Sequence, residues 1–193
     1  HLFLGGPGGL EPAGSLAIGA FPTAPLLVPA PGGGLGLVVA SKETRELVAF
    51  TLGRDGEQLV ARPAWQLEPG GVPRALALGA SELYWLDRDG LLVTLTWPAE
   101  AGPLGSAPTK GAAIDVGRDA RPVAALPLSA GGVVVLCQGD RSLRFLGEQA
   151  GALVELARHD FDGVPRSATE ADLDGDGDLE QAFFGGDRRV LIF

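Results

Sequence analysis

Residues 73–97 read PRALALGASELYWLDRDGLLVTLTW, and this stretch decides the predicted fold. A proline opens it, and three short apolar runs follow at 75–78, 83–86 and 91–97, separated by turn residues. The Asp89-Gly90 step supplies the positive φ that tight hairpin turns need. No window of the chain sustains a helical apolar period without Gly or Pro. The sequence therefore predicts an all-β fold of short antiparallel strands.

Two markers repeat along the chain. Aromatic residues that end apolar runs are spaced by 47, 47, 48 and 48 residues: Phe3, Phe50, Trp97, Phe145 and Phe193. Prolines that open apolar runs are spaced by 48, 49 and 43 residues: Pro25, Pro73, Pro122 and Pro165. Together they predict four repeats of about 48 residues, with units at 4–50, 51–97, 98–145 and 146–193. Four short strands per unit are typical of β-propeller blades, and such even spacing disfavours a β-sandwich.

The phase of the repeat bears on how the predicted propeller closes. Residues 1–4 and 190–193 occupy the same third-strand position, so the chain spans four periods. Residues 13–18 are expected to supply the fourth strand of the blade that begins at Pro165, which would remove an exposed sheet edge. The chain is thus either a closed four-bladed ring or four consecutive blades of a larger propeller.

Composition and charge limit the classes of partner that the chain is expected to bind. The chain has 15 basic and 24 acidic residues and a net charge of −9, which argues against nucleic acid and anionic membranes. Residues 160–180 carry −7 of that charge and the rest only −2, which suits contact with protein. The longest uncharged stretch, 12–41, contains five prolines, so no transmembrane segment is expected. The single cysteine, Cys137, lies in the apolar run 133–137 and is expected to be buried.

The nine residues 172–180, DLDGDGDLE, are the most specific feature of the sequence. Carboxylates alternate along them: Asp172, Asp174, Asp176, Asp178 and Glu180. Such a column of like charges is repulsive unless a cation binds, and the order suits Ca²⁺, which takes six to eight oxygen ligands. An EF-hand is disfavoured because that loop needs twelve residues and flanking helices, whereas an apolar strand is expected to follow this one directly. Magnesium is the second choice because it demands near-octahedral geometry.

Residues 167–179 resemble the calcium-binding core of FG-GAP and VCBS repeats, which form the blades of bacterial surface proteins and of integrin α-chain propellers. The resemblance implies one structural calcium ion between the first two strands of the last blade. It assigns the carboxylates of Asp172, Asp174 and Asp176, the carbonyl of Asp178, and Glu180 as ligands. The corresponding loops at 31–34, 79–81 and 129–132 contain no carboxylate.

Catalytic motifs are missing from the sequence. The two histidines are His1 and His159, and there is no Gly-x-Ser-x-Gly elbow and no phosphate-binding loop. His159 is expected at a turn between blades. We therefore expect a non-enzymatic, calcium-stabilised module outside the cytoplasm, in the periplasm, on the cell surface or secreted. It would act in adhesion or assembly by binding a protein partner or as a subunit of a larger complex. The alternative is a propeller lyase or hydrolase with its active site in the central channel.

Overall fold

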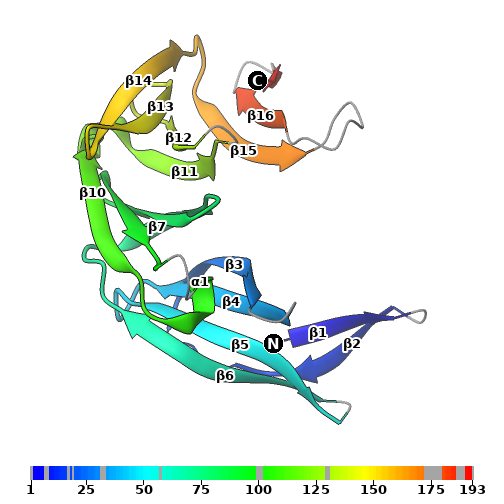
Figure 1. Ribbon diagram of the computed structural model, residues 1–193. Helices are drawn as coiled ribbons and strands as arrows, with labels where there is room; N and C mark the ends of the chain where they lie inside the picture. The colour runs from blue at the N-terminus through cyan, green and yellow to red at the C-terminus, as the bar shows by residue number, and fades with distance from the viewer. Residues whose placement is uncertain are drawn as a thin grey trace. The chain divides into compact units, whose positions relative to one another are not determined.

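The computed structural model describes residues 2–6, 9–16, 18, 20–30, 34–56, 58–98, 102–128, 131–171, 180–185 and 190–192. Within these residues the chain is almost entirely β-structure (Figure 1). The exceptions are the four-residue helix α1 (Gly102–Gly105) and the single 3₁₀ turn η2 (Arg118–Ala120). Neither is long or apolar enough to cross a membrane, and no other described helix is. The predicted all-β fold is confirmed.

The strands form antiparallel sheets in chain order. The first sheet contains β3 (Pro22–Ala30), β4 (Gly34–Ser41), β5 (Leu47–Asp55) and β6 (Gln58–Leu67). The second contains β7 (Pro73–Leu78), β8 (Glu82–Asp87), β9 (Leu91–Thr96) and β10 (Thr109–Asp115). The third contains β11 (Pro122–Pro127), β12 (Val133–Cys137), β13 (Ser142–Gln149) and β14 (Ala152–Asp160). The fourth, as described, contains β15 (Pro165–Ala171), β16 (Glu180–Gly185) and β17 (Val190–Ile192).

The described chain divides into two compact units. Unit 1 comprises His1–Glu68 and Trp97–Pro108, and unit 2 comprises Pro69–Thr96 and Thr109–Phe193. In unit 1 the connection between β9 and β10 packs on the first sheet, where Trp65 Nε1 donates a hydrogen bond to the carbonyl of Pro103 at 2.8 Å. Gly36 permits this approach, because a Cβ there would lie 2.2 Å from Leu104 Cδ1.

Each first strand begins with a proline that pairs with the last residue of the second strand. The prolines are Pro22, Pro73, Pro122 and Pro165, and their partners are Ser41, Asp87, Cys137 and Gly185. A shift in register follows each proline: directly after it in β7, β11 and β15, and one pair later in β3. The equivalent of Pro73 in the first sheet is therefore Pro22. The use of Pro25 as the marker was wrong, because Pro25 lies inside the strand at the register shift.

The aromatic marker does not mark one structural position. Phe50 lies inside β5 and Phe145 inside β13, whereas Trp97 follows the end of β9. The equivalent third-strand residues are aliphatic, each paired with the next-to-last residue of the second strand: Leu47, Leu92, Leu143 and Val190. The three leucines are fully buried. The repeat is real, but a buried aliphatic residue defines it.

The N-terminal strands differ from the prediction. β2 (Gly9–Gly14) pairs with β1 (Leu2–Gly6) in a two-stranded hairpin, so the described residues of 13–18 contain the end of β2 and no separate strand. Within unit 1, β2 also contacts β6. Closure into a four-bladed ring stays a prediction.

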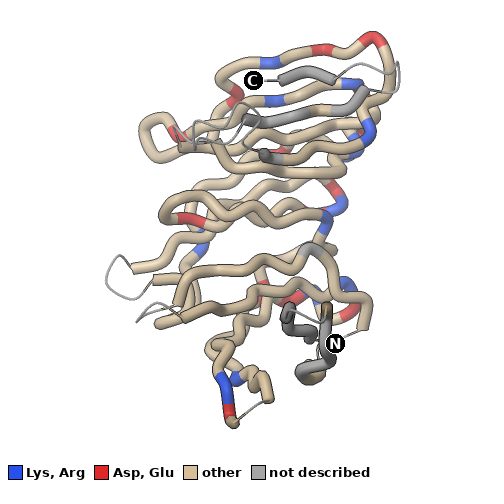
Figure 2. Tube along the Cα trace, turned by 90° about the vertical axis from the view of Figure 1, so that its right-hand side faces the viewer, with Lys and Arg blue, Asp and Glu red and all other residues tan. Residues whose placement is uncertain are grey.

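Charged residues are sparse along the chain, and Figure 2 shows long stretches of the trace without Lys, Arg, Asp or Glu. Among the described residues, Asp87 is the one charged residue in the buried class, with 5% exposure. The interior of each unit is therefore built from apolar side chains, whose burial is worth roughly 1.5–3 kcal/mol each for Val, Leu or Phe.

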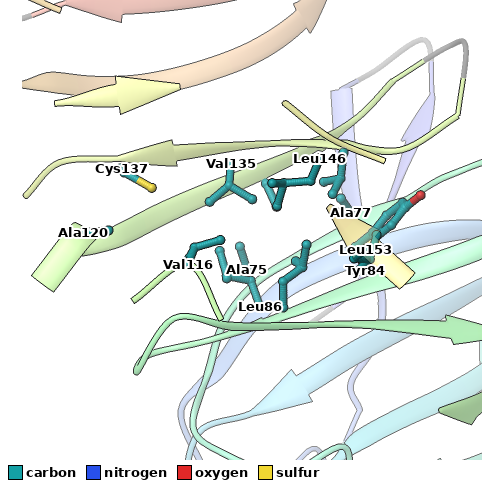
Figure 3. Close-up of a cluster of buried hydrophobic side chains, with 13 residues drawn as sticks. Ala75, Ala77, Tyr84, Leu86, Val116, Ala120, Val135, Cys137, Leu146 and Leu153 are labelled. Atoms are coloured by element: carbon teal, nitrogen blue, oxygen red, sulfur yellow. The ribbon is translucent and has the colours of Figure 1, made fainter. Parts of the chain in front are cut away.

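Strand β12 is the centre of the unit 2 core. Val133, Val135 and Cys137 join a cluster with the second sheet, and Val134 and Leu136 join a cluster with Phe183 of β16. Figure 3 shows Val135 and Leu146 facing Ala75 and Leu86 across the first of these clusters. Because alternate residues of a strand point to opposite faces, β12 is buried on both sides. This explains the uninterrupted apolar run at 133–137 and confirms that Cys137 is buried.

Candidate functional site

The predicted calcium loop joins the first two strands of the fourth sheet. β15 ends at Ala171 and β16 begins at Glu180, and these two residues pair with each other. Asp172, Asp174, Asp176 and Asp178 lie outside the described residues, as does the side chain of Glu180. The flanking elements are strands, as expected, whereas an EF-hand requires flanking helices.

The second sheet has a carboxylate at the position equivalent to Glu180. Glu82 begins β8 and lies five residues before Asp87, just as Glu180 begins β16 and lies five residues before Gly185. Both Asp87 and Gly185 pair with the proline that opens the preceding strand. Loop residues 79–81 contain no carboxylate, and Glu82 follows them directly as the first residue of β8. The register of the strands, rather than the loop motif, reveals this equivalence.

Hydrogen bonds from the protein satisfy the Glu82 carboxylate. Tyr84 donates its hydroxyl to Glu82 Oε1 at 2.7 Å, and Ser81 donates its hydroxyl to Oε2 at 2.6 Å. The Ser81 backbone N–H also donates to Oε2 at 3.3 Å. Gly79 leaves room for the group, since a Cβ there would lie 3.0 Å from Oε1. The β7–β8 connection thus holds one carboxylate with three donors.

These contacts fix the protonation states of both partners. Burial acts to raise the pKa of Glu82, but the hydrogen bonds from Ser81 and Tyr84 outweigh it and lower the pKa below its ordinary value. Burial, followed by the hydrogen bond to Glu82 and its negative charge, raises the pKa of Tyr84 well above its ordinary value. At neutral pH Glu82 is therefore an anion and Tyr84 a neutral donor.

A second polar cluster lies in the third sheet. Asp140 accepts a hydrogen bond from Ser142 Oγ at 2.7 Å and forms ion pairs with Arg144 and Arg158. Burial acts to raise the pKa of Asp140, but Arg144, Ser142 and Arg158 together lower it. Because arginines already neutralise the carboxylate, this cluster is suited to holding the hairpin together and not to binding a cation.

The described residues do not assemble a metal centre. No group of three His, Cys, Asp or Glu side chains converges among them. Burial raises the pKa of Cys137 to about 11, so its thiol stays protonated and unreactive. His159 lies within β14 instead of at the predicted turn. Its ring packs edge-on against the ring of Phe161, with the two ring centroids 5.2 Å apart.

Comparisons with known proteins support the fold. No protein-family model and no curated protein matches the chain. A crystal structure of BBS1N in complex with ARL6DN matches with a TM-score of 0.63 and 12% identity, over 89% of this chain and 46% of that one. A protein from Lactobacillus plantarum matches with a TM-score of 0.60 and 16% identity, over 95% of this chain and 58% of that one. A candidate 6-phosphogluconolactonase from Bacteroides fragilis matches with a TM-score of 0.56 and 14% identity, over 86% and 55%.

These neighbours are β-propeller-like, so the chain has a propeller-like fold whose sheets correspond to blades. The chain spans about half the length of the solved structures that it matches. At these identities the likeness concerns the fold alone.

Proposed function

We propose that the chain is part of a non-enzymatic β-propeller of the FG-GAP/VCBS kind, acting outside the cytoplasm as a calcium-stabilised module that binds a protein partner. The observation that carries the proposal is the place of the acidic loop. Four alternating carboxylates fall on the connection between the first and second strands of a sheet, and a fifth, Glu180, opens the second strand. This is the position at which the resemblance to FG-GAP and VCBS repeats expects calcium.

The composition of the loop supports a bound cation. Glu82 needs three donors from Ser81 and Tyr84 to satisfy one carboxylate. Residues 172–179 contain no hydroxyl, amide or basic side chain, so the loop has no side-chain donors for its own four carboxylates. A hard divalent cation supplies the missing positive charge, and calcium tolerates the irregular, high coordination that a short loop offers.

Two further observations support a role in protein binding. Outside residues 160–180 the chain is nearly neutral, with a net charge of −2, which favours contact with protein over contact with polyanions. The fold neighbour BBS1N was crystallised in complex with ARL6DN, so a propeller-like fold of this kind serves as a binding partner there.

A second candidate function is hydrolysis, favoured by the fold likeness to the candidate 6-phosphogluconolactonase. Hydrolysis would require converging acids, histidines or an activated nucleophile. In the described part of the chain no group of three His, Cys, Asp or Glu side chains that could hold a metal ion occurs, and the thiol of Cys137 is buried with a raised pKa. We expect no lactonase activity, and measurable hydrolysis of a sugar-phosphate lactone would reverse the order of the two candidates.

Thermal unfolding with and without calcium tests the proposal. A ligand at 100 times its Kd stabilises the native state by about 2.7 kcal/mol, which for a chain of this size raises Tm by roughly 5–10 °C. Magnesium should do less, and the double variant Asp174→Asn/Asp176→Asn should abolish the shift. A calcium Kd near the ~10⁻⁴–10⁻³ M of extracellular modules would support a place outside the cytoplasm. An unchanged Tm at about 10 mM calcium, roughly 10 to 100 times these Kd values, would contradict the proposal.

A further inference from the structure

Three arginines lie beside the prolines that open the first strands of unit 2. Arg74 follows Pro73, Arg121 precedes Pro122 and Arg166 follows Pro165. All three arginine residues are exposed, whereas the three prolines are buried. We call Arg74, Arg121 and Arg166 the arginine strip.

Hydrogen bonds connect the strip across neighbouring sheets. Arg74 Nε donates to the carbonyl of Pro122 at 3.2 Å, which brings the side chain of β7 to the start of β11. The backbone N–H of Gln138 donates to the carbonyl of Arg121 at 3.1 Å. The side-chain amide of Gln138 donates to the carbonyl of Pro165 at 3.0 Å. The three strand starts of unit 2 are therefore held side by side, in the order Arg74, Arg121, Arg166.

The backbone is irregular at each arginine of the strip. In β7, Pro73 pairs with Asp87 and Ala75 with Leu86, so Arg74 is the extra residue of a β-bulge. In β15, Pro165 pairs with Gly185 and Ser167 with Phe184, so Arg166 is the extra residue there. Bulges commonly redirect a side chain next to functional sites. Arg121 has φ of 48°, in the left-handed region that residues other than glycine rarely adopt.

The charge of the strip is not neutralised within the described chain. None of the three arginines forms an ion pair among the described residues. Two acids near the same strand ends are already engaged: Asp89 pairs with Arg118 at 3.4 Å, and Asp140 pairs with Arg158 at 3.4 Å and with Arg144. Among the described residues, these three exposed guanidinium groups are therefore available to bind an external anion.

We propose that the arginine strip binds an acidic segment of the protein partner. The inference rests on the proposed function and adds the chemistry of the partner. Guanidinium groups bind carboxylates through paired hydrogen bonds, which gives both affinity and orientation. Nucleic acid fits less well, because its binding rests on many phosphate contacts and the strip offers three cationic groups, whereas a short acidic segment brings only a few carboxylates.

Fluorescence anisotropy with a labelled oligoglutamate peptide tests the strip. The double variant Arg74→Gln/Arg166→Gln should weaken binding at least tenfold at low salt, because it removes two of the three guanidinium groups that would pair with the carboxylates of the peptide. The matched control is Arg54→Gln/Arg62→Gln, which removes two exposed arginines of β5 and β6 in unit 1 and should change affinity less than twofold. Arg166→Gln alone should weaken binding severalfold, and it removes no side-chain hydrogen bond among the described residues, so folding is not at stake.

The outcomes separate this inference from the proposed function. The proposed role of the strip would be wrong if the strip variant and the control lost peptide affinity equally. It would also be wrong if a single-stranded oligonucleotide bound more tightly than the peptide. Absence of peptide binding by the wild-type chain would also overturn it. The calcium-dependent rise in Tm should be unchanged in the strip variants. If that rise is missing while the peptide still binds through the arginines, the calcium assignment fails and the strip stands.

Discussion

The β7–β8 and β15–β16 connections occupy the same place in their sheets, yet they handle negative charge differently. Both second strands begin with a glutamate, Glu82 in one and Glu180 in the other. Glu82 is satisfied by Ser81 and Tyr84. The loop before Glu180 has four further carboxylates and no side-chain donor. The flanking strands are therefore equivalent in the two connections. Hydrogen-bond donors in or next to the connection distinguish the hydrogen-bonded turn at Glu82 from the predicted ion site before Glu180.

The largest expected effect comes from the buried aromatic residue of each second strand. Trp85 and Phe183 both lie three residues after the glutamate and are both fully buried. We expect Trp85→Ala and Phe183→Ala each to cost about 3–5 kcal/mol in urea unfolding. Only Phe183→Ala should also reduce the stabilisation by calcium, because it loosens the strands that frame the loop. Leu156→Ala, at a side chain 51% exposed, is the control and should change little. An equal calcium response in both alanine variants would break the comparison.

A smaller effect is expected at the tyrosine that completes the Glu82 turn. Tyr84→Phe removes the donor to Glu82 Oε1 and should cost about 1–2 kcal/mol, because the remaining charge is less well satisfied. Thr94 is a matched control, since it pairs with Tyr84 across β8 and β9 and its buried hydroxyl has no hydrogen-bond partner among the described residues. Thr94→Val should be neutral or stabilising by up to about 1 kcal/mol. A loss of stability in Thr94→Val as large as that in Tyr84→Phe would show that the Glu82 bond is not the cause.

The smallest effect is the pH dependence of the same pair. Because the folded pKa of Glu82 is lowered, its stabilisation is present above the ordinary value of 4.5 and is lost as pH falls through the folded pKa. Because the folded pKa of Tyr84 is raised, its stabilisation is present below the ordinary value of 10.0 and is lost as pH rises beyond it. Urea midpoints measured across pH should show both limbs. Glu82→Gln should flatten the acid limb and Tyr84→Phe the alkaline one; unchanged limbs would contradict the assignment.

Much of the fold follows from local patterns in the sequence. The hairpin of residues 83–97 and the burial of Cys137 in the run 133–137 were predictable, because apolar runs and turn chemistry act over a few residues. Pro22 was missed because a bulge places Pro25 at the register shift, and bulges leave little trace in composition. The packing of residues 97–108 on the first sheet depends on Trp65 and Gly36, far away in sequence.

The acidic motif of the candidate site was predictable from the sequence, but the strand positions that flank it were not. Alternating carboxylates at 172–180 indicate a cation loop from charge repulsion alone. The equivalence of Glu82 and Glu180 required strand register, because the residues before them share no pattern. The arginine strip was invisible for a similar reason, since three arginines about 45 residues apart meet only when the first strands lie side by side.

Calcium titration by isothermal calorimetry tests the central claim most directly, with Glu180→Gln and Glu82→Gln as paired variants. The account predicts one calcium site in the wild-type chain, at least tenfold weaker binding in Glu180→Gln, and unchanged binding in Glu82→Gln. No calcium binding by the wild-type chain, or equal weakening in the two variants, would contradict it.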